Sequence, residues 1–269
     1  MVAVSRDGQV AAYRLNDGGR RWHVRLGGRS ESSPLLMDGR VYLADDRGVV
    51  RALDLATGRE RWRAQVGAVV KAALAGEGGL VVAADYAGCL RALDRADGAT
   101  RWVRCWPGSR FYATPSIGGG AVVAGSYDGW FHALELATGE LRWSFRSLPG
   151  ARVTSAAAVA DGRAFLADDD GFVHAVDLTD GTPRWRWRDP LRPVPGRISG
   201  AVTVVGDTVY VARLTRPGEP KLTVGLDLRT GRPRWRTHDG RYTPAVADRD
   251  GFVLVGHTAL RAWPTPAGG

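Results

Sequence analysis

The chain has 269 residues, of which 44% are hydrophobic, enough apolar material for one large domain or two small ones. No apolar run approaches the length of a membrane-spanning helix, and the N-terminus lacks the basic and apolar regions of a secretory signal. We therefore expect a cytoplasmic protein without a membrane partner.

The net charge of +9 and the isoelectric point near 10.2 raise the question of a polyanionic partner. All but two of the 37 basic residues are arginines, the exceptions being Lys71 and Lys221. Such a skew resembles the coding bias of a GC-rich genome, and the sequence has no unbroken basic run. We therefore do not expect nucleic acid as the partner.

The two cysteines, Cys89 and Cys105, are too few for a disulfide framework or a thiolate metal site. A reducing compartment is compatible with two free thiols. Cys89 lies within a strand pattern, so we interpret it as a core residue.

A unit of about forty residues, closing on Arg-Trp, recurs six times and starts a seventh time. Successive tryptophans lie 40, 40, 41, 42 and 50 residues apart, and an inserted loop at 213–221 explains the last interval. We interpret these tryptophans as structural, because a large indole can fill the space that widens between the neighbouring sheets, or blades, of such a repeat fold. They are Trp22, Trp62, Trp102, Trp143, Trp185 and Trp235.

Each full copy contains four short strand signals separated by Gly or Asp-Gly turns. In the second copy we expect strands at residues 33–37, 41–44, 49–55 and 59–65. Four such strands cannot bury their faces alone, but they can when sheets pack face to face around an axis. The pattern predicts an all-β fold, a β-propeller of four-stranded antiparallel blades.

The two ends of the repeat are incomplete. Residues 1–4 align with 41–44, so the first copy lacks its first strand. The last copy reaches 260–263 and then meets Pro264, so it lacks its fourth strand. We predict seven blades in one domain at 1–263, with a tail at 264–269. Six blades, with 243–247 supplying the missing first strand, and a fragment of a longer protein are the alternatives.

The segments ALDLATGRERW at 52–62, ALELATGELRW at 133–143 and GLDLRTGRPRW at 225–235 resemble the PQQ-type propeller repeat. The resemblance covers nearly the whole chain and looks closest to a non-quinone, actinobacterial member. Members of this family include quinoprotein dehydrogenases, a scaffold lipoprotein of outer-membrane assembly, and sensor domains of actinobacterial Ser/Thr kinases. The resemblance therefore implies the fold and leaves the function open.

Quinone-dependent oxidation is not expected. The quinoprotein dehydrogenases use adjacent cysteines and a calcium ion held by acidic and amide side chains, whereas Cys89 and Cys105 are separated and Asn16 is the one asparagine. The five histidines show no metal-ligand spacing, and we interpret them as strand-surface residues. We predict neither a cofactor nor a metal. The histidines are His23, His132, His174, His238 and His257.

One column of arginines recurs ten residues before the turn that follows the first strand of a blade. Only the third copy departs, with Val69. These positions lie in the crossing from one blade to the next, which in propellers runs over one face, so we predict a ring of guanidinium groups at a channel mouth. The column consists of Arg29, Arg110, Arg152, Arg197 and Arg241.

Aromatic residues and loop residues accompany this column. Phe111, Tyr112 and Tyr242 adjoin it in sequence, and Lys71 begins the first strand of the copy that lacks the arginine. We expect the loops between second and third strands to reach the same face. They bring Asp45, Asp85, Tyr127, Asp168 and His257.

The leading hypothesis is a monomeric, non-catalytic propeller that binds an acidic small molecule or protein segment, because guanidinium forms bidentate bonds with carboxylates. The structural alternative is that the arginines only pair with Asp45, Asp85 and Asp168. A second hypothesis is a cyclase, lyase or hydrolase in which Lys71 has a lowered pKa and Tyr112, Tyr242 or Asp168 is its proton partner. A third is the sensor domain of a receptor kinase.

Overall fold

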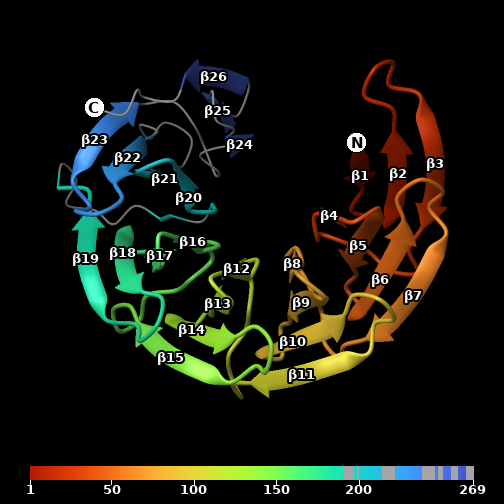
Figure 1. Cartoon of the computed structure of the whole chain (residues 1–269), viewed down its shortest axis with the longest axis horizontal. Helices are drawn as coiled ribbons and strands as arrows, with labels where there is room; N and C mark the ends of the chain where they lie inside the picture. The colour runs from red at the N-terminus through yellow and green to blue at the C-terminus, as the bar shows by residue number, and fades with distance from the viewer. Residues whose placement is uncertain are drawn as a thin grey trace. The chain divides into compact units, whose positions relative to one another are not determined.

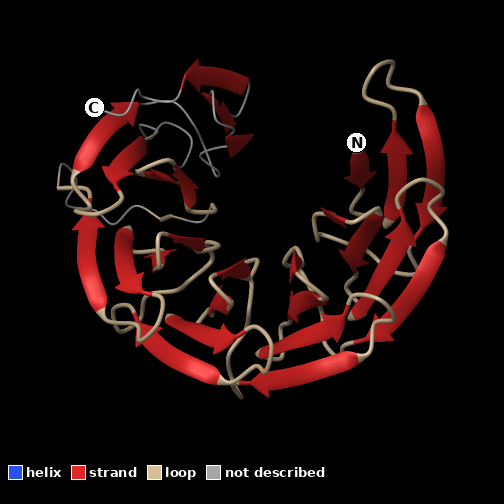
Figure 2. Cartoon of the chain, in the orientation of Figure 1, coloured by secondary structure: helices blue, strands red, loops and turns tan. Residues whose placement is uncertain are grey.

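The computed structural model describes residues 1–190, 197–198, 200–213 and 222–237, together with the backbone of 246–247, 251–255 and 260–264. In this part of the chain all regular elements are β-strands, as Figure 2 shows. No helix there is long and apolar enough to cross a membrane.

The strands form antiparallel sheets of consecutive strands, which we number as blades 1–7 (Figure 1). Blade 1 has three strands, β1 (Val2–Val4), β2 (Gln9–Tyr13) and β3 (Arg20–Arg25). Blades 2 and 3 have four each, β4 (Leu35–Met37), β5 (Arg40–Ala44), β6 (Val49–Asp54) and β7 (Glu60–Gln65), then β8 (Ala75–Glu77), β9 (Leu80–Ala84), β10 (Cys89–Asp94) and β11 (Thr100–Cys105).

Blades 4, 5 and 6 repeat the four-stranded pattern, and blade 7 has three described strands. The strands are β12 (Ser116–Gly118), β13 (Ala121–Gly125), β14 (Trp130–Glu135), β15 (Leu141–Arg146), β16 (Ala158–Ala160), β17 (Arg163–Ala167), β18 (Phe172–Asp177), β19 (Pro183–Arg188), β20 (Thr203–Val205), β21 (Thr208–Ala212), β22 (Thr223–Asp227), β23 (Pro233–Thr237), β24 (Val246–Ala247), β25 (Gly251–Val255) and β26 (Leu260–Pro264).

This arrangement confirms the predicted β-propeller class. Among the described residues it also confirms three strands in the first and last blades and four strands in each blade between them. The first strand of blade 2 begins at Leu35, two residues later than expected. Val246 and Ala247, which the six-blade alternative assigns to the first sheet, pair with β25. Residues 265–269, most of the predicted tail, lie outside the described residues.

The blades belong to two compact units. One comprises Met1–Ile117 with Glu135–Glu140, and the other comprises Gly118–Leu134 with Leu141–Gly269. Blades 1, 2 and 3 lie in the first unit and blades 5, 6 and 7 in the second. The single domain at 1–263 stays a prediction.

Each repeat tryptophan lies on the last strand of its blade, opposite a small residue on the preceding strand. Trp62 is in register with Ala52, and Trp143 with Ala133. Directly after this pair the register shifts by a β-bulge. A small residue opposite the indole leaves the ring free to turn toward the next blade.

The indole then contacts the following blade in two ways. Trp22 donates a hydrogen bond of 2.9 Å from Nε1 to the carbonyl oxygen of Leu55, and its ring lies against Gly58. The same pair of contacts recurs for Trp62, Trp102, Trp143 and Trp185. The predicted structural role of these tryptophans is confirmed for these five, and the partners are a backbone carbonyl and a turn glycine.

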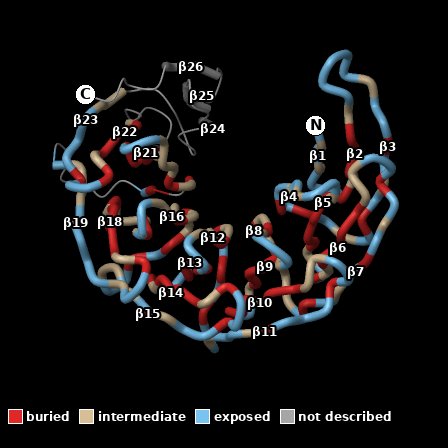
Figure 3. The backbone as a smooth tube through the Cα atoms, in the orientation of Figure 1, coloured by how far each residue is buried: buried red, intermediate tan, exposed pale blue. Residues whose placement is uncertain are grey.

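The core lies along the middle strands of the blades. Figure 3 shows buried backbone in the second and third strands and exposed backbone in much of the fourth strands. In β5 the residues Val41, Tyr42, Leu43 and Ala44 have no exposed surface. Burial on both faces explains why these strands are continuously apolar rather than alternating.

The expectation of free thiols is wrong. Cys89 of β10 and Cys105 of β11 are directly opposite each other and form a disulfide. Cys89 is a core residue as predicted, with 7% of its surface exposed. Their separation of 16 residues in sequence hid the fact that a hairpin brings them together.

The contact between turn glycine and tryptophan can be tested at Gly139. A methyl group there would lie 2.5 Å from Cδ2 of Trp102. Gly162 has a similar positive φ, 67° against 69°, but a methyl group there meets no atom within 4 Å. We expect Gly139→Ala to lower the free energy of unfolding by about 1–3 kcal/mol more than Gly162→Ala, measured by urea denaturation. Equal losses would show that the glycine is required by φ alone.

The disulfide can be tested by reduction. A covalent link that closes a loop of this length stabilises a protein by about 3 kcal/mol. We expect dithiothreitol to lower the free energy of unfolding of the native chain by about 2–4 kcal/mol. The double variant Cys89→Ala/Cys105→Ala should show the lower value with or without the reductant, and a shift in this variant would contradict the assignment.

Candidate functional site

The crossings between blades lie on the loops between second and third strands. The amide of Asp46 donates a hydrogen bond of 2.8 Å to the carbonyl oxygen of Arg29, and the amide of Asp169 donates one of 2.9 Å to that of Arg152. In the third copy the amide of Tyr86 bonds in the same way to Val69. We call the side of a blade that carries these crossings and loops its crossing face.

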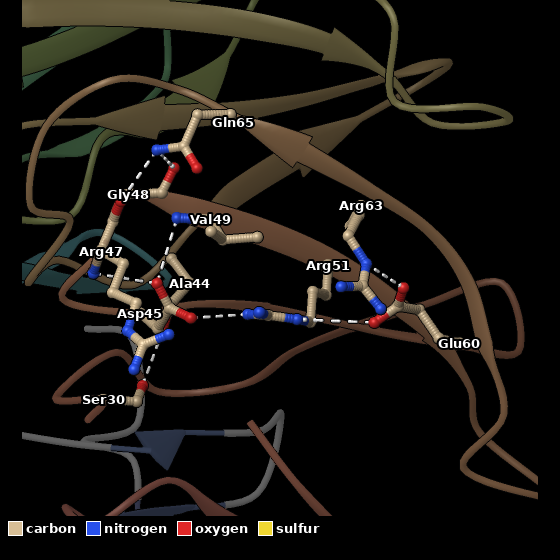
Figure 4. A network of polar contacts seen from close by, with 10 residues as sticks. All are labelled: Ser30, Ala44, Asp45, Arg47, Gly48, Val49, Arg51, Glu60, Arg63 and Gln65. Atoms are coloured by element: carbon tan, nitrogen blue, oxygen red, sulfur yellow. Dashed lines mark hydrogen bonds and ion pairs between the residues drawn. The ribbon is translucent and has the colours of Figure 1, made fainter. Parts of the chain in front are cut away.

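The aspartate of each loop points inward. Figure 4 shows Asp45, whose Oδ1 accepts hydrogen bonds from the amides of Arg47 and Val49 and whose Oδ2 pairs with Arg51 at 2.6 Å. Asp45 has no exposed surface. Its carboxylate therefore stabilises the loop and the interior of its own blade.

Asp85 and Asp168 are held in the same way, with hydrogen bonds from the amides two and four residues later. The expectation that these aspartates reach the face, and the alternative that they neutralise the described arginines of the column, are both wrong. Asp168, the predicted proton partner of an enzyme, has no exposed surface. For the aspartates the face-exposed loop position is one residue later than predicted, whereas Tyr127 occupies that position and is exposed as predicted.

The arginines of the described column are exposed. Arg29 and Arg110 form no ion pair with a described residue, whereas Nε of Arg197 lies 3.0 Å from Oδ2 of Asp169. Arg29 and Arg110 belong to one compact unit and Arg152 and Arg197 to the other, so their arrangement as a ring stays a prediction. Three predicted site residues lie outside the described residues, Arg241, Tyr242 and His257.

In each of these loops, the residue that follows the inward-pointing one contacts a side chain in the crossing to the next blade. We call these contacts the loop–crossing pairs. They occur in five consecutive blades, at separations of about the same length in sequence. The pairs are Arg6–Glu31, Asp46–Lys71, Tyr86–Tyr112, Tyr127–Arg152 and Asp169–Arg197.

Two of the pairs form one chain of opposite charges. Glu31 accepts a hydrogen bond of 2.6 Å from Arg6 and lies 3.3 Å from Nζ of Lys71, which itself lies 2.9 Å from Asp46. The hydrogen bond to Asp46, with that to Glu31, raises the pKa of Lys71. The lowered pKa that the enzyme hypothesis requires of Lys71 is therefore wrong.

The pairs of blades 3 and 4 contain tyrosines. The rings of Tyr86 and Tyr112 lie 6.0 Å apart and are tilted by 33°. Arg152 donates a hydrogen bond of 2.8 Å to the hydroxyl of Tyr127, and its guanidinium lies 4.9 Å from the ring centre. Phe111, predicted to bind ligand, instead has no exposed surface and packs against Trp106.

His132 and His174 are buried rather than on the strand surface, with 4% and 6% of their surfaces exposed. They occupy the position of Arg51, as the repeat predicts. His174 lies 3.1 Å from the hydroxyl of Ser147, but that hydroxyl donates directly to Asp168. The three side chains therefore lack the relay of a catalytic triad, in which histidine separates the serine from the acid.

Sequence reasoning missed Arg6, Glu31, Asp46, Tyr86 and Asp169 as residues of the face. A signal was present, because each loop member of a pair stands two residues before a glycine with positive φ. Such a glycine fixes the turn, and the turn fixes which of two adjacent side chains points outward.

Two open hollows lie on the crossing face of the first unit. One, of about 390 Å³, is lined by Arg29, Asp46 and neighbouring residues. The other, of about 320 Å³, is lined by Arg6, Glu31 and a run of serines. Among the described residues no group of three histidine, cysteine, aspartate or glutamate side chains is arranged to hold a metal ion. The face thus offers concave, charged surface for a ligand.

Fold and repeat together define a β-propeller with PQQ-type repeats. The family model described as outer membrane protein assembly factor BamB matches residues 6–111 and 88–255. The chain therefore belongs to this family of PQQ-like repeat propellers. No curated protein matches it in sequence.

Solved structures show the same fold. BamB from Moraxella catarrhalis is 22% identical, with a TM-score of 0.77 over 98% of this chain and 79% of that one. The computationally designed protein Ika8 is 17% identical, with a TM-score of 0.82 over 98% and 80%. Quinohemoprotein alcohol dehydrogenase from Comamonas testosteroni is 16% identical, with a TM-score of 0.66 over 79% and 43%. At these identities the likeness establishes the fold alone.

The buried histidine position makes stability depend on pH. Burial lowers the pKa of His132 to about 4. The unfolded chain, with a histidine pKa of about 6.5, binds the proton first, so stability is lost as the pH falls from about 6.5 to about 4. We expect this residue to contribute about 3 kcal/mol of that loss.

His132→Val should remove this contribution, because Val224 occupies the same position in blade 6. Urea denaturation at pH 7 and pH 4 measures it. His23→Val, at an exposed histidine, should keep the pH dependence of the native chain. An unchanged pH dependence in His132→Val would contradict the assignment.

Proposed function

We propose that this chain is a non-catalytic recognition propeller that binds an acidic small molecule or an acidic segment of another protein at the crossing face. The observation that carries the proposal is the availability of Arg29 and Arg110, which belong to the same compact unit. Both are exposed and form no ion pair with a described residue, and the carboxylates of Asp45 and Asp85 are used inside the blades.

Exposed guanidinium groups that form no ion pair suit a carboxylate or phosphate, which they bind through two parallel hydrogen bonds. The two hollows beside Arg6 and Arg29 give such a ligand a concave surface. The family supports a role in protein interaction, because its model is described as an assembly factor. The contacts of Lys71 argue against the enzyme hypothesis, since Asp46 and Glu31 raise its pKa.

The cellular location is a separate proposal. The disulfide between Cys89 and Cys105 favours an oxidising compartment, because cytosolic proteins are kept reduced. The cytoplasmic location predicted from the N-terminus is the alternative. Thiol labelling of the protein taken directly from its native cell would distinguish the two.

The arginines can be tested with a pentaglutamate peptide as the probe. The double variant Arg29→Ala/Arg110→Ala removes two cations from the crossing face. Exposed ion pairs contribute up to about 1 kcal/mol each, so we expect binding to weaken by about threefold to 30-fold in isothermal titration calorimetry.

The matched control is Arg20→Ala/Arg59→Ala. These exposed arginines lie at the opposite ends of the strands, next to the turns that precede the last strands of blades 1 and 2, and their loss changes the net charge equally. The control should bind as the native chain does. Equal weakening in both double variants would show attraction by net charge alone, and unchanged binding in Arg29→Ala/Arg110→Ala would overturn the proposal.

A further inference from the structure

The pair Tyr86–Tyr112 differs from the other four loop–crossing pairs in the described residues, because neither member is charged. Its position is that of an ion pair in blades 1, 2 and 5. Two aromatic rings therefore replace a self-neutralising contact, while the loop amide keeps the hydrogen bond to the crossing carbonyl that it forms in blades 2 and 5. At this position the face therefore presents uncharged aromatic rings to a ligand, whereas it presents ion pairs in blades 1, 2 and 5.

The rings are partly open to solvent. Tyr112 is 48% exposed, and it is one of two exposed large aromatic side chains among the described residues, the other being Tyr127 of the next pair. Aromatic surface exposed on a loop contributes little to the core, and such residues are enriched where proteins bind partners. Among the described residues, the exposed aromatic side chains of the face thus lie in the loop–crossing pairs of blades 3 and 4.

Arg110 adds a positive charge beside these rings. It is exposed, it precedes Tyr112 by two residues, and its charge opposes the rise in the pKa of Tyr86. Burial raises that pKa to about 12. A phenol is neutral at physiological pH with or without this rise, so Tyr86 does not repel an anion. Asp85, the nearest loop aspartate in sequence, is bonded to the amides of Ala87 and Cys89.

An aromatic group packs on tyrosine rings in an offset or edge-to-face arrangement, and a carboxylate beside it pairs with a guanidinium. We propose that Tyr86, Arg110 and Tyr112 form a subsite that selects an aromatic side chain next to an acidic residue in the ligand. This inference rests on the proposed function. It adds a specificity that the arginines alone do not provide.

Two peptides of equal charge distinguish the contribution of an aromatic ring to binding from that of the carboxylates. One is acetyl-Glu-Glu-Trp-Glu-Glu-amide, and the other has alanine in place of tryptophan. Aromatic pairs contribute about 0.5–1.5 kcal/mol beyond the area they bury, so we expect the native chain to bind the tryptophan peptide about fivefold to tenfold more tightly. Calorimetric titration measures both affinities.

Tyr112→Ala should reduce the affinity for the tryptophan peptide to that for the alanine peptide and leave the latter unchanged. Tyr112→Phe keeps the ring and should keep the preference. Leu141→Ala, at a 52% exposed residue at the start of β15, removes a similar exposed apolar side chain away from the crossing face and should behave as the native chain. Unchanged melting temperatures would establish that all three variants are folded.

The outcomes distinguish this inference from the proposed function. Equal binding of both peptides by the native chain, or a preference that survives Tyr112→Ala, overturns the subsite and leaves the proposed function standing. A fall in affinity for both peptides in Tyr112→Ala likewise assigns Tyr112 a role other than selection. Failure of the native chain to bind either peptide overturns the proposed function and the subsite with it.

Discussion

The contact between a repeat tryptophan and the turn glycine of the following blade is the interaction on which the rest of the molecule depends. The indole covers a glycine that has no side chain and donates a hydrogen bond to a backbone carbonyl near that glycine. A hydrogen bond of this kind contributes about 0.5–1.5 kcal/mol. The contact recurs for five of the repeat tryptophans because the repeat recurs.

The crossing face is built on this regular framework. The hydrogen bond from a loop amide to a crossing carbonyl is the same in blades 2, 3 and 5. Side chains at the loop–crossing pairs of these blades change from ion pairs to tyrosines while this backbone hydrogen bond is kept. A fold that holds the backbone fixed can vary recognition at these positions without disturbing the core.

Charge on this chain divides into two classes by position. Arg51, paired with the buried Asp45, compensates a charge that would be costly inside the protein. Arg29 and Arg110 lie on exposed loops and are compensated by no described carboxylate. The high net charge of the sequence does not separate these classes, because both kinds of arginine contribute equally to it. The separation depends on which side chains point inward.

The sequence by itself determined the propeller class, the strand pattern of the blades and the structural role of the tryptophans, because each follows from local periodicity and turn residues. It also located the arginine column, since that column recurs at a fixed position. Tertiary structure decided the rest. The disulfide depends on hairpin register, the inward turn of Asp168 depends on two backbone amides, and the burial of Phe111 depends on packing against Trp106. Each of these contacts depends on how a side chain is oriented toward a partner, and the order of residues along the chain does not determine that orientation.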